Sequence, residues 1–207
     1  MERTGEAADA VLTKDDRWSA IGTVALAVLL GSATVAFGVA DIVRIVTEDP
    51  VSLLAPFSGE PAQLPIGPGA EMREVSVESA HISAPGIPAV SYTALVGGVV
   101  AGIVATLVVL ACVSVLCLNI VRRRIFAVSN ARALTIAASA VGFGWAVTFL
   151  ADTVAINGAF NAISGGDYNN VLAQTNFTPL LGVFVLGALA AAFRVGERLQ
   201  RDTEGLV

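Results

Sequence analysis

Residues 92–124 read YTALVGGVVAGIVATLVVLACVSVLCLNIVRRR. The first 30 of these residues carry no charge. A run of that length can cross a hydrocarbon layer about 30 Å thick as an α-helix. Three arginines follow at once, and basic residues beside an apolar helix favour the cytoplasmic side of a membrane. The stretch therefore predicts a transmembrane helix that ends inside the cell.

The composition of the whole chain also indicates a membrane environment. Apolar residues make up 55% of the 207 residues and charged residues only 14%. Soluble domains carry roughly 25% charged residues, and one core could not hide this much apolar surface. The net charge of −5 does not indicate a nucleic-acid-binding surface, so we expect membrane lipid as a partner and no direct binding of nucleic acid.

Three more apolar runs flank the first one. Trp18–Ala40 holds 23 residues without a charge, Ala133–Ala151 holds 19, and a further run begins at Phe177. We therefore predict an all-α integral membrane protein, a four-transmembrane-helix bundle.

A cleaved signal peptide ending near Ala40 is the rival interpretation of the first run. The net acidic region before it and its length argue against that interpretation.

The segment between the first two helices differs in character. Residues 47–91 hold seven of the eight prolines, so this segment cannot be a spanning helix. Within it, Arg73–Glu78 alternates polar and apolar residues, which is typical of a strand. We expect a small extracytoplasmic cap that could include a short β-ribbon.

The basic residues predict the orientation. Ten of the twelve lie in the N-terminal tail, in the connector after the second helix, or at the C-terminal end. Short basic segments stay inside, so both termini are expected in the cytoplasm of a multi-pass cell-membrane protein. The expected layout is a tail 1–17, helices 18–46, 92–121, 133–156 and 177–195, outer loops 47–91 and 157–176, a basic connector 122–132 and a tail 196–207.

Three charged residues lie nearest the predicted membrane: Asp41, Arg44 and Asp152. A charge inside a bilayer is costly and is usually paired or functional. One hypothesis is that Arg44 pairs with Asp152 or Asp41 and lines an intramembrane polar site. The alternative, which we prefer because all three lie near the end of a helix, is that they are interfacial residues in contact with water.

Two features of the second helix suggest contacts with other helices. Gly98 and Gly102 are four apart on one face, a spacing that lets another helix approach closely and that could support a homo-oligomer. Asn119 could donate a hydrogen bond to a neighbouring helix. The arginines that follow are expected to fix topology and contact anionic lipid headgroups, with docking of a cytoplasmic protein as the alternative: Arg122, Arg123 and Arg124.

No catalytic or metal-binding motif is visible in the sequence. The only histidine, His81, is expected in the outer cap, with no cysteine near it. Cys112 and Cys117 lie on nearly opposite faces of one helix, so we expect reduced packing residues. We therefore expect no enzyme activity, no cofactor and no metal.

The C-terminal residues Phe193–Val207 read FRVGERLQRDTEGLV, and the connector contains Arg-Ile-Phe126. Both resemble motifs of a family of uncharacterised bacterial four-helix membrane proteins, a domain of unknown function, whose members end in F-x-x-G-x-x-L-Q-x-[DE]-x-[DE]-x-x-V. The matching positions are Phe193, Gly196, Leu199, Gln200, Asp202, Glu204 and Val207. The resemblance implies a bacterial inner membrane location and a small helix-turn-helix regulator encoded nearby.

The tail also has a physical interpretation of its own. Charges of both signs recur at helical spacing from Arg194 onward, so the last helix could continue past the membrane. The tail could dock a cytoplasmic protein through Leu199, Gln200, Asp202 and Glu204, or fold back onto the arginine connector. We expect a non-catalytic regulatory or interaction protein that links the outer face to a cytoplasmic partner. The alternative is a subunit of a small transporter or channel.

Overall fold

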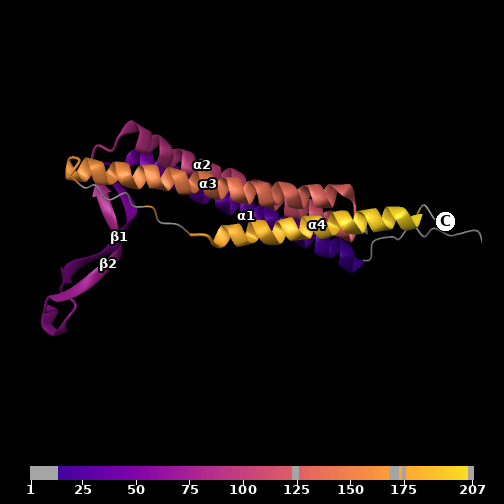
Figure 1. The fold of residues 1–207 in the computed structure, drawn as a ribbon, viewed down its shortest axis with the longest axis horizontal. Helices are drawn as coiled ribbons and strands as arrows, with labels where there is room; N and C mark the ends of the chain where they lie inside the picture. Colours follow the sequence, from indigo (N-terminus) through magenta and orange to yellow (C-terminus); the bar gives the residue numbers. More distant parts are fainter. Residues whose placement is uncertain (1–13, 123–125, 168–172, 174–175, 205–207) are drawn as a thin grey trace, which may run out of the picture. The chain divides into compact units, whose positions relative to one another are not determined.

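The computed structural model describes residues 14–122, 126–167, 173 and 176–204, and the described part is mostly helical (Figure 1). In this part of the chain, one long helix comes first, a two-stranded ribbon follows it, and three more long helices come after the ribbon. The elements are α1 (Lys14–Thr47), β1 (Val51–Leu64), the short 3-10 helix η1 (Pro68–Ala70), β2 (Arg73–Ala84), α2 (Ala89–Val121), α3 (Val128–Ser164) and α4 (Thr178–Glu204).

Four helices are long and apolar enough to cross a membrane, as the sequence predicts. These stretches are Trp18–Thr47, Ala89–Val121, Val128–Ser164 and Thr178–Thr203. Large apolar side chains on them point outward: Phe37 and Phe143 are each 74% exposed, and Phe184 is 75% exposed. Surface of this kind is unfavourable in water and suits lipid. The fold is thus compatible with a multi-pass membrane protein.

All four helices extend beyond the bounds expected from the sequence, and α3 and α4 do so the most. α3 begins at Val128 and ends at Ser164, so residues 157–164, expected in a loop, are helical. The reason is tertiary burial, because Ala159 and Phe160 in this part are buried. The helix ends where Gly165 and Gly166 adopt positive φ angles of 65° and 96°, which glycine tolerates. α4 continues through Glu204, and the expected extension past residue 195 is confirmed.

The ribbon is longer than the short one expected around Arg73–Glu78. β1 and β2 pair antiparallel from Val51 opposite Ala84 to Leu64 opposite Arg73. The register shifts between Pro56 and Glu60, at an irregularity that includes Gly59 with φ of 76°. Prolines inside β1 hide it from sequence analysis. They are tolerated because each strand of a two-stranded ribbon has an edge that needs no N–H donor.

The contacts divide the chain into two compact units. The first comprises Met1–Ala33, Thr106–Val141 and Gly182–Val207, and the second comprises Thr34–Ala105 and Gly142–Leu181. In the first unit, small apolar residues of α3 form the buried face, together with Ala190 of α4: Ala131, Ala133, Leu134, Ala137 and Ala138. Gly182 of α4 lies opposite Val141 of α3, with 4.0 Å between a Cβ built at Gly182 and the valine methyl.

Small residues bring α2 and α3 together in the second unit. A Cβ built at Gly98 would lie 2.9 Å from the Ala151 methyl group, and one at Gly144 would overlap Ala105. Farther along, Gly158 leaves room for Ser91, whose hydroxyl donates a 3.2 Å hydrogen bond to the carbonyl oxygen of Val154. We call this row of contacts the α2–α3 seam. Small residues at these positions allow the two helices to approach closely.

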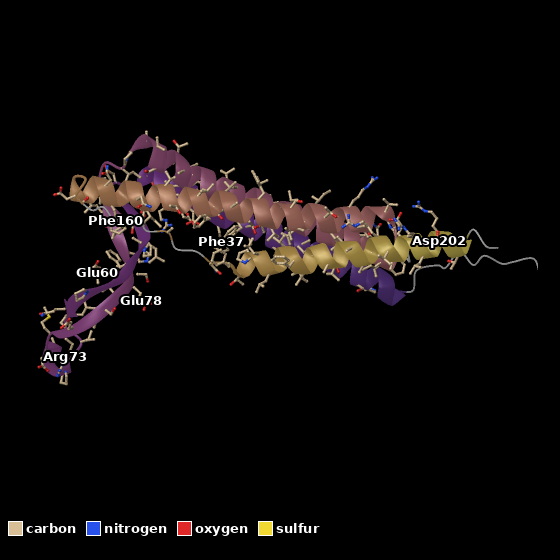
Figure 2. The ribbon with its side chains drawn as sticks, in the orientation of Figure 1. Phe37, Glu60, Arg73, Glu78, Phe160 and Asp202 are labelled. Atoms are coloured by element: carbon tan, nitrogen blue, oxygen red, sulfur yellow. The ribbon has the colours of Figure 1, made fainter. Side chains whose placement is uncertain are left out.

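The ribbon is attached to the helices by its first half. Alternate residues of β1 point to one face, as the two-residue period of a strand requires. Val51 and Leu53 pack with Ala159 of α3, and Ala55 packs with Ile156 and Phe160. Beyond the irregularity in the register, the ribbon exposes both charged residues, such as Glu60, Arg73 and Glu74, and apolar ones, Leu64, Ile66 and Met72. Figure 2 labels Phe160 where the ribbon meets α3, Glu60 and Glu78 farther out, and Arg73 toward the tip.

Candidate functional site

The second unit contains a cavity of about 330 Å³ between β1, α2 and α3. Its walls are mostly apolar, and one carboxylate, that of Asp152, lines it. The full lining is Leu53 and Leu54 of β1, Leu95 of α2, and Asp152, Thr153, Ala155 and Ile156 of α3. Three separate elements therefore meet here, and the attachment of the ribbon to α3 completes the cavity.

The polar groups of the cavity differ in their bonding. The Thr153 hydroxyl donates a 2.8 Å hydrogen bond to the carbonyl oxygen of Phe149, so its proton is already used within the helix. Among the described residues, the Asp152 carboxylate accepts no hydrogen bond and joins no salt bridge. Asp152 is an exposed residue, so the cavity opens to the surface beside a carboxylate that has no partner among the described residues.

Asp41 and Arg44 do not join Asp152. The Arg44 guanidinium contacts the Asp41 carboxylate at 3.2 Å across one turn of α1, and about half of each side chain is exposed. An exposed pair of this kind contributes only about 0–1 kcal/mol to stability. Of the two pairings in the first hypothesis, the structure contains the Asp41–Arg44 one.

An aromatic cluster at the start of α4 was not anticipated from sequence. The Trp145 indole N–H donates a 2.8 Å hydrogen bond to the carbonyl oxygen of Asn176. The same ring stacks on Phe149 with 5.8 Å between centroids and lies 6.0 Å from Phe177. The cluster therefore attaches the start of α4 to the middle of α3. The only signal in the sequence is a tryptophan inside an apolar run.

Asn119 contacts a neighbouring helix, as expected. Its amide donates to Oδ1 of Asn130 at 2.7 Å and to the Ser129 hydroxyl at 3.0 Å. Asn130 has 0% exposed surface and is the largest fully buried side chain among the described residues. The contact joins the end of α2 to the start of α3.

Two residues of the C-terminal motif pack against Phe126 of the connector between α2 and α3. The Phe126 ring lies 5.9 Å from that of Phe193, and Gly196 leaves the space that the Phe126 ring occupies. We call these three residues the Phe126 cluster. Two motif positions therefore serve packing within the chain, which sequence reasoning did not assign to them.

The other tail residues have different surroundings. Leu199 is 61% exposed, and Asp202 is exposed near the end of α4 (Figure 2). Gln200 makes a contact within the chain. Arg122 is exposed and forms no salt bridge with Asp202, whereas Arg123, Arg124 and the side chain of Glu204 lie outside the described residues. The only tail salt bridge in the described part joins Arg201 to Glu197 at 2.6 Å.

The glycine face of α2 is occupied within the chain. Gly98 packs against Ala151 and Gly102 lies 3.8 Å from Thr148, measured from a Cβ built at the glycine. This face is therefore not free for a second copy of the chain in this conformation. A homo-oligomer would need another surface.

The remaining candidates show no assembled chemistry. His81 is exposed on β2 opposite Leu54, and Cys112 and Cys117 are free thiols, partly buried in α2. No group of three or more His, Cys, Asp or Glu side chains in the described ranges is arranged to hold a metal ion. No known protein family, curated protein or solved structure matches this chain.

Proposed function

We propose that this chain is a non-catalytic multi-pass membrane protein that links a recognition module outside the cell to a protein partner in the cytoplasm. The observation that carries the proposal is the ribbon, which is attached to α3 at one end and presents exposed charged residues along the other. A ribbon that served only to close a loop would not need 14 residues in β1 and 12 in β2.

The basic residues support an orientation with both termini inside. The aromatic cluster of Trp145, Phe149 and Phe177 supports an outer boundary of the bilayer at that level of α3, since tryptophan favours the membrane interface. The sequence before α4, GGDYNNVLAQTN at 165–176, is polar and belongs in water. With 37 residues, α3 is ~55 Å long and exceeds the hydrocarbon core by about 25 Å.

The orientation is tested with single cysteines in living cells. A cysteine at exposed Met72, near the ribbon tip, is expected to react with a membrane-impermeant maleimide, and one at Thr203 is expected to react only after permeabilisation. Cys112 and Cys117 are first replaced by alanine. Reaction of the Thr203→Cys variant in intact cells would reverse the proposed sides.

The end of α4 is the proposed surface for the cytoplasmic partner. The Phe126 cluster holds this helix end, and Leu199 stands exposed among charged residues beyond it. Val195, one turn before it, is 60% exposed, and we propose that these two neighbouring apolar side chains contact the partner. A small helix-turn-helix regulator, as the family resemblance implies, is the partner we propose.

In-cell crosslinking tests the partner. A photocrosslinking amino acid replaces Leu199 in the full chain, and the matched control places it at Leu181, which is 66% exposed on the apolar part of α4. We expect a discrete protein adduct at position 199 that mass spectrometry identifies as a small helix-turn-helix protein. The same adducts at both positions, or no adduct at position 199, would refute a cytoplasmic partner at the end of α4.

The second candidate function is a subunit of a small transporter or channel. The cavity lined by Asp152 favours it, because an unpaired carboxylate near the membrane can bind a cation. Flux measured in liposomes tests it with the variant Asp152→Ala. Flux at the leak level in both the native chain and the variant would exclude this role for the chain on its own.

A further inference from the structure

The cavity of the second unit combines two properties that restrict its ligand. The walls supplied by Leu53, Leu95 and Ile156 are apolar, and Asp152 supplies a carboxylate without a partner among the described residues. A neutral apolar ligand would cover the carboxylate without compensating its charge, which is unfavourable. An anion would be repelled.

Two kinds of cation can also be set aside. A divalent metal ion such as Ca²⁺ takes six to eight oxygen ligands, whereas the cavity offers one carboxylate and one hydroxyl that is bonded within the helix. A small inorganic cation would lose water to apolar walls that cannot replace it. The remaining class is a cation that carries its own apolar body.

We propose that this cavity binds a small organic cation, with a primary ammonium on the Asp152 carboxylate and an apolar body against Leu53, Leu95 and Ile156. The volume of about 330 Å³ lies at the small end of the range for ligand sites, so the body is the size of one ring with a short chain. The inference rests on the proposed function in one respect, that this end of α3 faces water outside the cell.

The described arginines of this unit do not occupy the Asp152 carboxylate. The basic residue of α1 in the same unit, Arg44, is engaged by Asp41. In the ribbon, Arg73 contacts Glu71 at 2.8 Å. Neither of these two arginines therefore forms a salt bridge with Asp152.

Protection of a cysteine in the cavity wall tests the proposal on the full chain in detergent, with Cys112 and Cys117 replaced by alanine. Leu95→Cys places a thiol in the wall. Val90→Cys, at a site 70% exposed on the same helix and outside this cavity, is the control. The probes are phenethylammonium, neutral 2-phenylethanol and anionic phenylacetate, and the readout is the rate of maleimide modification.

We expect phenethylammonium to slow modification of the Leu95→Cys variant in a saturable way and to leave the Val90→Cys variant unchanged, while the other two probes protect far less. Asp152→Asn should weaken the protection by about tenfold. Calorimetric titration of phenethylammonium into the chain with its native cysteines, with and without Asp152→Asn, repeats the measurement in a chain without the wall variant.

Equal protection by phenethylammonium and 2-phenylethanol would overturn the role of Asp152. No protection of the thiol at position 95, together with no heat in the titration, would overturn the site itself. Neither result bears on the crosslinking at Leu199 or on the labelling at Met72 and Thr203, so failure of this inference is distinguishable from failure of the proposed function.

Discussion

The amide of Asn119 donates a 2.7 Å hydrogen bond to Oδ1 of Asn130, a side chain with no exposed surface. Asn119→Leu removes the donor and leaves a buried acceptor with one partner fewer. We expect the variant to lose about 1–2 kcal/mol of unfolding free energy, the upper range for hydrogen bonds between transmembrane helices. Denaturant titration in mixed micelles measures the loss.

A double variant provides the control for this bond. Because Asn119→Leu and Asn130→Leu remove the same interaction, their combined cost should be smaller than the sum of the two single costs. Costs that add fully would show that the two amides do not depend on each other.

The Phe126 cluster predicts that position 196 accepts glycine only. Gly196→Ala places a methyl group where the Phe126 ring lies, so the ring must move away from Phe193. We expect a loss of about 1–2 kcal/mol in unfolding free energy from overpacking, measured in the same titration. Gly187→Ala on the same helix is the control, since no atom lies within 4 Å of its added Cβ, and it should be neutral or slightly stabilising.

Restoring space should restore stability. Phe126→Leu combined with Gly196→Ala is expected to recover part of the loss, because the smaller side chain leaves room for the methyl group. If Gly196→Ala and Gly187→Ala behave alike, the motif glycine has no packing role.

Adjacent glycines of α2 should respond differently to enlargement. Gly98 faces Ala151 across the α2–α3 seam, whereas Gly97 meets no atom within 4 Å. Gly98→Val is expected to cost about 1–3 kcal/mol of unfolding free energy through overpacking, and Gly97→Val much less. An equal response, or dimer-specific crosslinks through a cysteine at position 98, would indicate that Gly98 faces a second copy instead.

One aromatic contact should strengthen the attachment of the ribbon to α3. The Phe57 and Phe160 rings meet edge to face with 5.5 Å between centroids, and Phe160 is buried. Phe160→Ala is expected to loosen the ribbon and the end of α3 that packs against it, with a local cost of about 3–5 kcal/mol, while the rest of the helices stay folded. Hydrogen exchange of residues 51–56 measures the release. Phe143→Ala, at an exposed ring, should leave that exchange unchanged.

The helices were predictable because their apolar runs are long and uncharged. Trp18–Ala40 and Tyr92–Val121 lie inside α1 and α2. The end of α3 was not predictable, since the sequence from Asn157 to Ser164 is only weakly apolar and becomes helical by packing against the ribbon. The strand β1 was hidden by its prolines, which are acceptable only in a strand with a free edge.

The candidate site was predictable only in part. A charge near the end of an apolar run singles out Asp152, but the walls of its cavity come from β1 and α2, far away in sequence. The Phe126 cluster was visible as two separate motifs, in the connector and in the tail. Their contact depends on the pairing of helices, which periodicity does not specify.

The seam between α2 and α3 also restricts how this protein can move. Each small residue, Gly98, Gly144 or Gly158, receives one particular partner, and a shift of the helices by one residue along their axes would place larger side chains in those gaps. A sliding motion of one helix along the other is therefore blocked. A conformational change transmitted along α2 and α3 would therefore be a tilt or a rotation of the two helices together.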